Sequence, residues 1–544
     1  MKNATLWRRG RQAAQVVSVI LFLGLALLTF HGSTLILPLD LYFRLDPLAA
    51  FGAMLAARLI MPGLLLALGM LALGLVFGRA WCGWLCPLGA LLDWITPRRP
   101  GKIEPHPNWR GIKYILLAFI AAAALFGNLS LMLLDPITLL NRALSSAFIP
   151  GLNVVIAAVE PVLYNLPPLA AAIDGFESGV RGTVLPAQQT YYQLGWVMAL
   201  VLASLIALNW VAPRFWCRYL CPLGGLYGLT GKLAFLQPQA VSECDHCAQC
   251  MRACPTSAIT VTKQGFKIDP AECVLCLDCT AACPLAGIDF KLALPRYQRN
   301  AATNLAPGTT VESNSAAEKS VDAQKRGAAT ADSPVMTRRQ ALTGMALGVA
   351  SVAILRTAPA ARRDDPYLIR PPGARENGLL DKCIRCAECV RTCPTGGLQP
   401  SLMESGIEGL WTPVLIPRLG YCDYSCNACG QVCPTGAIPL LALEEKRKQI
   451  IGVAYIDQNR CIPWSAYRPC IVCQEMCPVP DKAIKLEQVD VETPDGQTAH
   501  LQRPLVVHSL CIGCGICEYQ CPLTGPAAIR VYAPMQYPLL QDLG

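Results

Sequence analysis

The sequence predicts an α-helical membrane bundle of four spans, built from two similar hairpins, followed by two α+β domains that carry metal-binding cysteines. Three observations indicate this fold class. Four long apolar runs lie in the first 211 residues, 28 cysteines recur in short motifs, and W-C-x3-C-P-L-G occurs twice. A chain of 544 residues is too long for one ordinary domain, and 53% apolar residues with a mean hydropathy of +0.38 is high for a soluble protein.

The first domain, residues 1–235, contains the apolar runs. Each run is near the roughly 20 residues that span ~30 Å of hydrocarbon. They cover about residues 13–30, 60–78, 112–134 and 192–211. Basic residues gather beside their predicted inner ends, so both W-C-x3-C-P-L-G loops are expected on the cytoplasmic side. The net charge of +9 is then a topology signal, and the basic residues do not form the aromatic-laced patch of a nucleic-acid-binding protein.

Residues 152–173 are also apolar and raise the question of a fifth span. Glu160, Pro161, Pro167 and Pro168 argue against it. We therefore expect short helices or re-entrant pieces on the outer surface, where irregular backbone is shielded by protein or water.

The duplicated motif lies at residues 81–89 and 216–224, directly after an apolar run in each case. The repeat extends upstream, because an Asp-Pro pair begins at Asp46 and again at Asp135. A duplicated bundle places its two copies side by side. The sequence therefore predicts one shared metal centre formed by Cys82, Cys86, Cys217 and Cys221. Two separate dithiols, or free structural thiols, are the alternatives.

Residues 236–297 contain two copies of C-x2-C-x2-C-x3-C-P, the pattern of bacterial two-cluster ferredoxins, in which the fourth cysteine of each copy ligates the other cluster. One predicted [4Fe-4S] ligand set is Cys244, Cys247, Cys250 and Cys283. The second set is Cys273, Cys276, Cys279 and Cys254. Zinc knuckles fit the three-residue gap and the Cys-Pro ending poorly. The fold class expected here is an α+β ferredoxin-like domain with two clusters.

Residues 298–335 are small, polar and charged, and such a composition cannot bury enough apolar surface to order itself, so we expect a linker. Residues 336–360 begin with Met336, Arg338 and Arg339, continue as a small and apolar run, and end in Ala-x-Ala. This order is typical of a twin-arginine export signal. A fifth membrane helix with basic flanks is the alternative, and both place residues 361–544 outside the cytoplasm.

The last domain, residues 361–544, carries four more cysteine motifs, of which the middle two have a widened first gap. Their cysteines are Cys383, Cys386, Cys389, Cys393, Cys422, Cys426, Cys429, Cys433, Cys461, Cys470, Cys473, Cys477, Cys511, Cys514, Cys517 and Cys521. They suit four [4Fe-4S] clusters in an α+β polyferredoxin domain. The fourth cysteines could be exchanged in nested or in sequential order, and the adjacency of the two irregular motifs favours nesting. Such spacings are unlike a disulfide framework.

The order of these parts resembles a known family. Residues 1–297 resemble the NapH-type membrane subunit of periplasmic nitrate reductase quinol dehydrogenases, with its four helices, two C-x3-C-P loops and cytoplasmic two-cluster ferredoxin. Residues 336–544 resemble the exported NapG-type subunit, with its twin-arginine start and widened third motif. The fusion departs from the family pattern. The resemblance implies oxidation of (mena)quinol at the inner membrane, with electrons passing through [4Fe-4S] clusters to an exported partner such as a periplasmic nitrate reductase. The cysteine motifs predict six such clusters, and the duplicated C-x3-C-P pairs suggest a seventh.

Quinol oxidation releases protons, so an acceptor is needed near the outer membrane edge. Asp46, Asp135 and His31 are the candidates for this catalytic role, with Arg142 and Arg58 as polar partners. An Asp before Pro is also a common helix cap or turn residue, so a purely structural role is the alternative. The sequence has no C-x2-C-H motif and no pair of membrane histidines, so no haem is expected.

Two other functions compete with quinol oxidation. One is an assembly or regulatory ferredoxin-type factor for a respiratory metalloenzyme. The other is ferredoxin-driven reduction of quinone, but a pump of that kind needs carboxylates inside its helices, and the four runs are nearly free of them. Nothing in the apolar runs alone offers a step for electrons across about 30 Å of hydrocarbon, so the sequence leaves the link between the two sides open.

Overall fold

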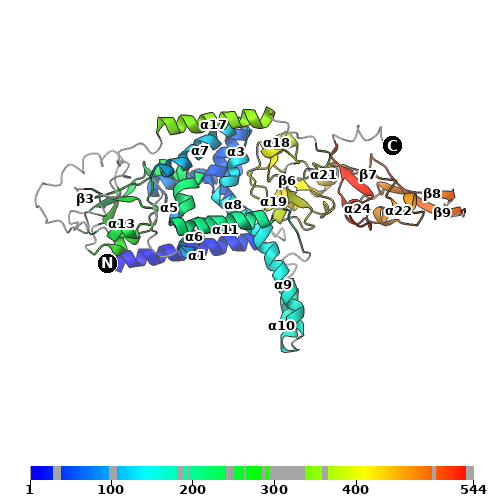
Figure 1. The fold of residues 1–544 in the computed structure, drawn as a ribbon, viewed down its shortest axis with the longest axis horizontal. Helices are drawn as coiled ribbons and strands as arrows, with labels where there is room; N and C mark the ends of the chain where they lie inside the picture. The colour runs from blue at the N-terminus through cyan, green and yellow to red at the C-terminus, as the bar shows by residue number, and fades with distance from the viewer. Residues whose placement is uncertain are drawn as a thin grey trace, which may run out of the picture.

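The molecule is an elongated row of domains with the helical bundle at its centre (Figure 1). The computed structural model describes residues 2–28, 38–96, 107–165, 167–180, 189–193, 195–240, 247, 249–262, 265–284, 288–292, 337–357, 365–402, 404–492, 496 and 498–534. His31, Cys244, Met336 and the predicted linker, residues 298–335, lie outside the described residues.

Two matching sets of helices form the bundle. The first set consists of α1 (Lys2–Leu28), α2 (Leu41–Arg44), α3 (Pro47–Ala57), η2 (Pro62–Leu64), α4 (Leu66–Phe77), α5 (Ala80–Trp84) and α6 (Pro87–Ile95). The second consists of η3 (Pro107–Gly111), α7 (Ile112–Leu125), η4 (Ser130–Leu134), α8 (Pro136–Ala143), η5 (Leu144–Phe148), α9 (Ile149–Tyr164), α10 (Pro167–Val180), α11 (Gly195–Val211), η6 (Trp216–Leu220) and α12 (Pro222–Gly231). The duplication read from the sequence is therefore a duplication of helices.

Among the described residues, two helices are long and apolar enough to cross a membrane by length and composition, Thr5–Leu28 and Pro136–Tyr164. Shorter apolar helices are Pro47–Ala57, Pro62–Phe77 and Gly195–Val211. Short helices or re-entrant pieces are expected from the sequence for the apolar stretch at residues 152–173. This expectation is wrong, because α8, η5 and α9 form one continuous helix that runs through Pro161. A proline removes one intrahelical hydrogen bond, and the apolar helix formers around it keep this helix intact. Figure 1 shows α9 and α10 extending away from the other helices.

The ferredoxin-like domain lies at one end of the bundle (Figure 1). Strand β1 (Leu236–Ala240) pairs antiparallel with β4 (Ile288–Leu292), and β2 (Ile259–Thr262) pairs with β3 (Gly265–Ile268). The short helices α13 (Gln249–Ala253) and α14 (Asp278–Ala282) each carry one motif cysteine, Cys250 and Cys279 respectively. Pairing of the first strand with the last closes the domain around both motifs.

Helix α17 (Arg338–Thr357) lies along α7 and carries the chain towards the opposite end of the bundle, where the C-terminal domain begins (Figure 1). The nearer half of that domain contains α18 (Glu376–Leu380), α19 (Glu388–Arg391), β5 (Leu398–Pro400), η8 (Ile407–Gly409), β6 (Pro413–Leu415), α20 (Ala428–Gln431) and α21 (Leu443–Arg447). The farther half contains β7 (Val453–Ile456), α22 (Ile462–Ser465), α23 (Val472–Glu475), β8 (Ile484–Glu492), β9 (Thr498–Val506), α24 (Ile516–Tyr519) and β10 (Ile529–Tyr532). Antiparallel pairs are β5 with β6, β7 with β10, and β8 with β9.

A single buried core runs through the bundle and into both neighbouring domains. It includes Val274 and Cys276 of the ferredoxin-like domain and Ile384 and Cys386 of the C-terminal domain, together with the four bundle cysteines. The two cysteine-rich domains are therefore packed onto opposite ends of the bundle through apolar contacts.

Candidate metal centres and their connections

The two C-x3-C-P turns adopt the same local structure. Cys86 precedes Pro87, the first residue of α6, and its sulfur accepts a hydrogen bond from the Gly89 backbone N–H at 3.5 Å. In the second copy the Cys221 sulfur accepts one from the Gly224 N–H at 3.2 Å. A proline in the first turn suits a helix start because its missing N–H has no helical partner there. Each motif therefore presents a cysteine sulfur at the N-terminus of a short helix.

Two arginines cross between the turns. Arg79, three residues before Cys82, donates to the Cys217 carbonyl oxygen at 2.9 Å. Arg214, three residues before Cys217, donates to the Cys82 carbonyl oxygen at 3.1 Å. Both guanidinium groups are fully buried. Basic residues beside apolar runs are expected to be topology signals, but the identical offset of these arginines before each W-C pair indicates a shared structural role.

The bundle cysteines fit a metal cluster in chemistry and charge. All four are buried in one core, with backbone N–H groups on two of the sulfurs and two guanidinium groups beside the turns. Buried cations and N–H donors stabilise an anionic thiolate-bound centre. In the described part of the chain, no group of three or more His, Cys, Asp or Glu side chains is arranged to hold a single metal ion. A cubane cluster differs from a single ion because each thiolate binds a different iron.

Four-cysteine cavities show how the motifs of the other domains are paired. In the ferredoxin-like domain one cavity is lined by Cys254, Cys273, Cys276 and Cys279, as the sequence predicts. In the C-terminal domain three cavities are lined by Cys383, Cys386, Cys389 and Cys433; by Cys393, Cys422, Cys426 and Cys429; and by Cys461, Cys470, Cys473 and Cys521. The fourth cysteine is thus exchanged between the first and second motifs, and between the third and fourth.

The nested order favoured by the sequence is therefore wrong. Pairing of β7 with β10 encloses the third and fourth motifs in one half, so they exchange ligands with each other. The long gap in the third motif contains α22, whose Trp464 ring lies 4.4 Å from the Arg503 guanidinium on β9. The widened spacing accommodates a local helix and does not indicate which motifs exchange their fourth cysteine.

Burial raises the pKa of two cysteines in these cavities, Cys273 and Cys473, to about 12 in each case. Because iron binds the thiolate, cluster insertion has to release the protons of these two thiols.

The ferredoxin-like domain touches the bundle with its cluster-binding loop, residues 271–276. The Trp84 ring N–H donates to the Leu275 carbonyl oxygen at 3.0 Å, and Arg79 donates to the Ala271 carbonyl oxygen at 3.0 Å. Gly83 lies so close that a Cβ atom there would be 2.2 Å from the Val274 carbonyl oxygen. The turn between Cys82 and Cys86 is therefore in direct contact with the loop that carries Cys273 and Cys276.

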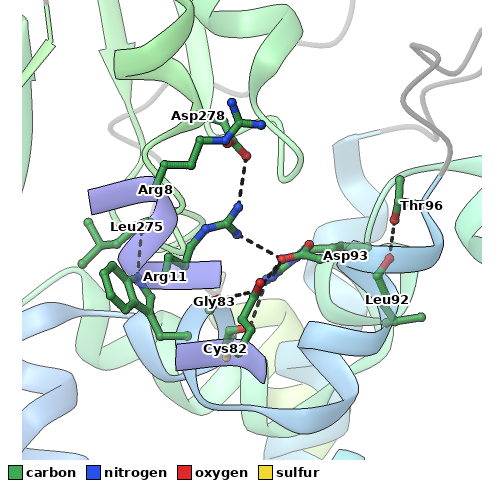
Figure 2. Close-up of polar contacts among 12 residues, drawn as sticks. Arg8, Arg11, Cys82, Gly83, Leu92, Asp93, Thr96, Leu275 and Asp278 are labelled. Carbon is green, nitrogen blue, oxygen red and sulfur yellow. Dashed lines mark hydrogen bonds and ion pairs between the residues drawn. The ribbon is translucent and has the colours of Figure 1, made fainter. Parts of the chain in front are cut away.

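A buried ion cluster fixes the same contact. Glu272 binds Arg79 at 2.8 Å and also binds the Lys113 ammonium group. Burial alone would raise the pKa of Glu272, but the two cations outweigh it and lower that pKa from the usual 4.5 to about 2. Figure 2 shows a second link, in which Arg11 lies between Asp93 of the bundle and Asp278 of the ferredoxin-like domain, at 3.1 and 3.6 Å. From the sequence alone, Arg11 is expected only to be a topology signal beside the first apolar run.

Asp46 and Asp135 are brought together at the centre of the bundle. Each carboxylate caps a helix: Asp46 accepts from the Leu48 N–H at 2.9 Å and Asp135 from the Thr138 N–H at 2.8 Å. Both are fully buried, and the two side chains are within hydrogen-bonding reach of each other. Both aspartates thus cap helices, as the structural alternative expects, and their carboxyl groups are also paired; the proton-accepting role stays a prediction. Arg58 is exposed at the C-terminal end of α3.

The C-terminal domain binds the bundle through polar groups that follow Asp135. Asn141 donates to the Cys386 carbonyl oxygen and accepts from Arg391, both at 2.7 Å. The Arg142 guanidinium lies 5.6 Å from the centre of the Trp411 ring. Asn141, Arg142 and Arg391 are each about 1% exposed. The role of Asn141 could not be predicted from the sequence, since a single asparagine in a helix has no distinctive pattern.

Comparison with known protein families agrees with these cysteine sites. A 4Fe-4S binding domain matches residues 59–105 and 194–238, the two bundle repeats. Dicluster 4Fe-4S domains match residues 243–286, 265–394 and 382–438. The chain therefore contains several 4Fe-4S binding domains, and the match at 382–438 encloses the two motifs that share cysteines in the nearer half of the C-terminal domain.

Several relatives are ferredoxin-type proteins. The methylamine utilization ferredoxin-type protein MauM of Methylorubrum extorquens is 37% identical over 205 residues, which are 36% of this chain and 88% of that protein. MauM of Paracoccus denitrificans is 38% identical over 222 residues, 38% of this chain and 90% of that protein. The ferredoxin-type protein NapG of Escherichia coli is 36% identical over 168 residues, 29% of this chain and 68% of that protein. No solved structure matches the chain.

Proposed function

The chain belongs to the family of ferredoxin-type proteins that includes MauM and NapG, and from this premise we propose that it is a membrane-bound quinol dehydrogenase. In this proposal it takes electrons from (mena)quinol and passes them to an exported redox partner, such as a periplasmic nitrate reductase. The iron-sulfur electron-transfer role is common to the family, whereas the quinol, the NapH-like nature of the bundle and the partner are proposals.

The proposal places the bundle across the inner membrane in four spans. The ferredoxin-like domain, residues 236–297, would then be cytoplasmic and residues 361–544 periplasmic. This is supported by the position of these two domains at opposite ends of the bundle (Figure 1). It is also supported by the apolar outer faces of the helices, where Leu68, Leu73 and Leu200 are about half exposed.

The main support for the proposal is that a cluster-binding loop contacts the bundle at each of its two ends. At one end, Gly83 and Trp84 touch residues 274–275, directly between two cluster-binding cysteines. At the other end, Asn141 holds the carbonyl oxygen of Cys386. The four bundle cysteines belong to the same buried core as Cys276 and Cys386. This shared core supports a role for the bundle cysteines as an intermediate step, which the apolar runs alone do not offer.

When bound, the clusters accept electrons one at a time, and the chain supplies their spacing and charge. Quinol loses two electrons and two protons as it becomes quinone, so a proton acceptor is needed beside the electron path. Asp46 and Asp135 are proposed as that acceptor, with His31 as the third candidate. Because both carboxyl groups are fully buried, protons would reach them through the bundle interior and not by direct contact with bulk water.

The test is anaerobic mixing of the purified protein with menaquinol, followed by spectroscopy of cluster reduction. Rapid reduction supports the proposal. If no quinol reduces the clusters while dithionite does, the protein is not a quinol dehydrogenase, and an assembly or regulatory role becomes the better explanation. Iron and acid-labile sulfide analysis separates six from seven clusters, because four irons per cluster give about 24 or about 28 irons per chain.

A further inference from the structure

We propose that α17 is a permanent helix of the bundle, which holds the C-terminal domain on it, and is not an export signal that is removed. The residues in question are those expected to be a twin-arginine signal, 336–360, of which the structure describes 337–357. This inference does not depend on quinol as the substrate.

The first observation is the close packing of α17 on α7. A Cβ atom at Gly344 would lie 2.6 Å from the Ile115 carbonyl oxygen and 2.8 Å from the Ala118 Cβ. A Cβ atom at Gly348 would lie 2.8 Å from the Phe119 carbonyl oxygen. Small residues four apart allow two helix backbones to approach closely, which is the usual way that helices associate in lipid. The two glycines thus form a contact with α7 that a larger residue could not make.

The second observation is the exposure pattern along α17. Gly344, Gly348 and Val352, spaced by four residues, are the buried positions. Leu342, Leu347 and Ile354 are 52–65% exposed on the remaining surface. A cleavable signal needs only an apolar run, whereas a single buried stripe of matched spacing indicates a helix with a fixed partner.

The third observation is independent of α17 and concerns the domain that follows it. The Asn141 amide is bonded to both Cys386 and Arg391, and the Tyr191 carbonyl oxygen accepts from the Gln399 side chain at 3.1 Å. Asn141, Arg391 and Gln399 are each about 1% exposed. The C-terminal domain therefore presents to the bundle a buried face whose polar groups are paired, as expected of two parts of one folded chain.

Together these contacts imply that the C-terminal domain, with its cluster sites, stays bound to the bundle from which it receives electrons. An export signal that was removed would leave the domain held only by its non-covalent contacts with the bundle. With α17 retained, the domain is also joined covalently to a helix that packs on α7, and delivery of electrons to it is intramolecular.

The experiment measures retention of α17 in the full-length holoprotein. Intact-mass analysis should give one polypeptide of 58.6 kDa, and a mature fragment beginning near residue 361 would overturn the proposal. A protease site is then placed within residues 298–335 and cleaved in detergent. The C-terminal fragment, α17 included, should co-elute with the bundle, and free elution of the wild-type fragment would also overturn the proposal.

Variants then assign the retention to these contacts. Gly344→Leu with Gly348→Leu, combined with Asn141→Leu, should increase the released fraction at least about tenfold, the effect of roughly 1.4 kcal/mol. The matched control is Gly69→Leu, because nothing lies within 4 Å of a Cβ atom at this helical glycine. Equal release from the control and the combined variant would contradict the role of α17. The wild-type mass and co-elution measurements decide the question even if the combined variant does not fold.

Discussion

Glu272 offers a direct test of how the ferredoxin-like domain is held, through the substitution Glu272→Gln. The side chain is about 4% exposed and lies between two fully buried cations, Arg79 and Lys113. An amide in its place leaves both cations without a counter-charge. Removal of one partner from a buried ion pair costs about 3–5 kcal/mol. The pKa gives a similar figure, since a fall from 4.5 to about 2 corresponds to roughly 3 kcal/mol.

Hydrogen exchange measures this loss in the folded protein. The amides of residues 265–284 should lose protection about a hundredfold in Glu272→Gln, because roughly 3 kcal/mol is two powers of ten in an opening equilibrium. The control is Glu487→Gln, the same change at an exposed position on β8. Unchanged protection in Glu272→Gln would refute the reasoning.

The sign of the pH dependence follows from the lowered pKa. A carboxyl group whose pKa is lower in the folded state stabilises it at pH values above the unfolded pKa, and this contribution is lost as the pH falls through the folded pKa. The stability difference between wild type and Glu272→Gln should therefore be largest above pH 4.5 and shrink as the pH falls towards about 2. A difference that grows on acidification would contradict the assignment.

Three further predictions concern the bundle and the C-terminal domain. Cys82→Ser with Cys217→Ser should lower the iron content by about four per chain without loss of the other clusters' spectra, and an unchanged iron content would exclude the shared centre. Asp46→Asn keeps a good helix cap, so we expect little change in melting temperature. Because it removes an acid, the clusters should be reduced by menaquinol roughly a hundredfold more slowly. An unchanged rate would mean that Asp46 is only a helix cap. Gly513→Ala should destabilise the farther half of the C-terminal domain by more than about 2 kcal/mol, because φ of Gly513 is +72° and a Cβ atom would lie 2.3 Å from the Gly452 backbone. Denaturant unfolding measures this loss. A stability like that of wild type would show that this turn can relax.

The sequence was a good guide where cysteine chemistry sets the structure. The motif spacing predicted the ligand set Cys254, Cys273, Cys276 and Cys279, which the structure brings to one cavity. It also predicted that the duplicated turns would converge, and all four of their cysteines are in one core. Ligand geometry is local, so a short pattern contains nearly all the information needed to predict it.

The sequence was a poor guide where a residue acts through a distant partner. Arg79 and Glu272 are 193 positions apart, and Asn141 and Arg391 are 250 apart. No periodicity links such pairs, and a basic residue beside an apolar run has the same pattern whether it faces lipid headgroups or a buried carboxylate. Pairing of the C-terminal motifs failed for a related reason, because it depends on the strand pairing of β7 with β10 and not on motif spacing.

Divergence between the two repeats explains two of the closest contacts that the domains make with the bundle. The first turn reads W-C-G-W-L-C and the second W-C-R-Y-L-C, so Gly83 corresponds to Arg218. Only the glycine leaves room for the Val274 carbonyl oxygen, which would be 2.2 Å from a Cβ atom. At the other end Asn141, six residues after Asp135, corresponds to Gly52, six residues after Asp46, and only the asparagine can bind Cys386.

The duplicated turns thus bring four cysteines into one core, and Gly83 allows the ferredoxin-like loop to approach one of these turns closely. Gly83→Ala should therefore separate the ferredoxin-like loop from the bundle cysteines while the cysteine sites themselves stay intact. The measurement is magnetic interaction between reduced clusters by electron paramagnetic resonance, which should weaken in Gly83→Ala. It should be unchanged in Gly69→Ala, where a Cβ atom meets nothing within 4 Å. Equal interaction in both variants would mean that loop 271–276 is not the route between the ferredoxin-like domain and the bundle.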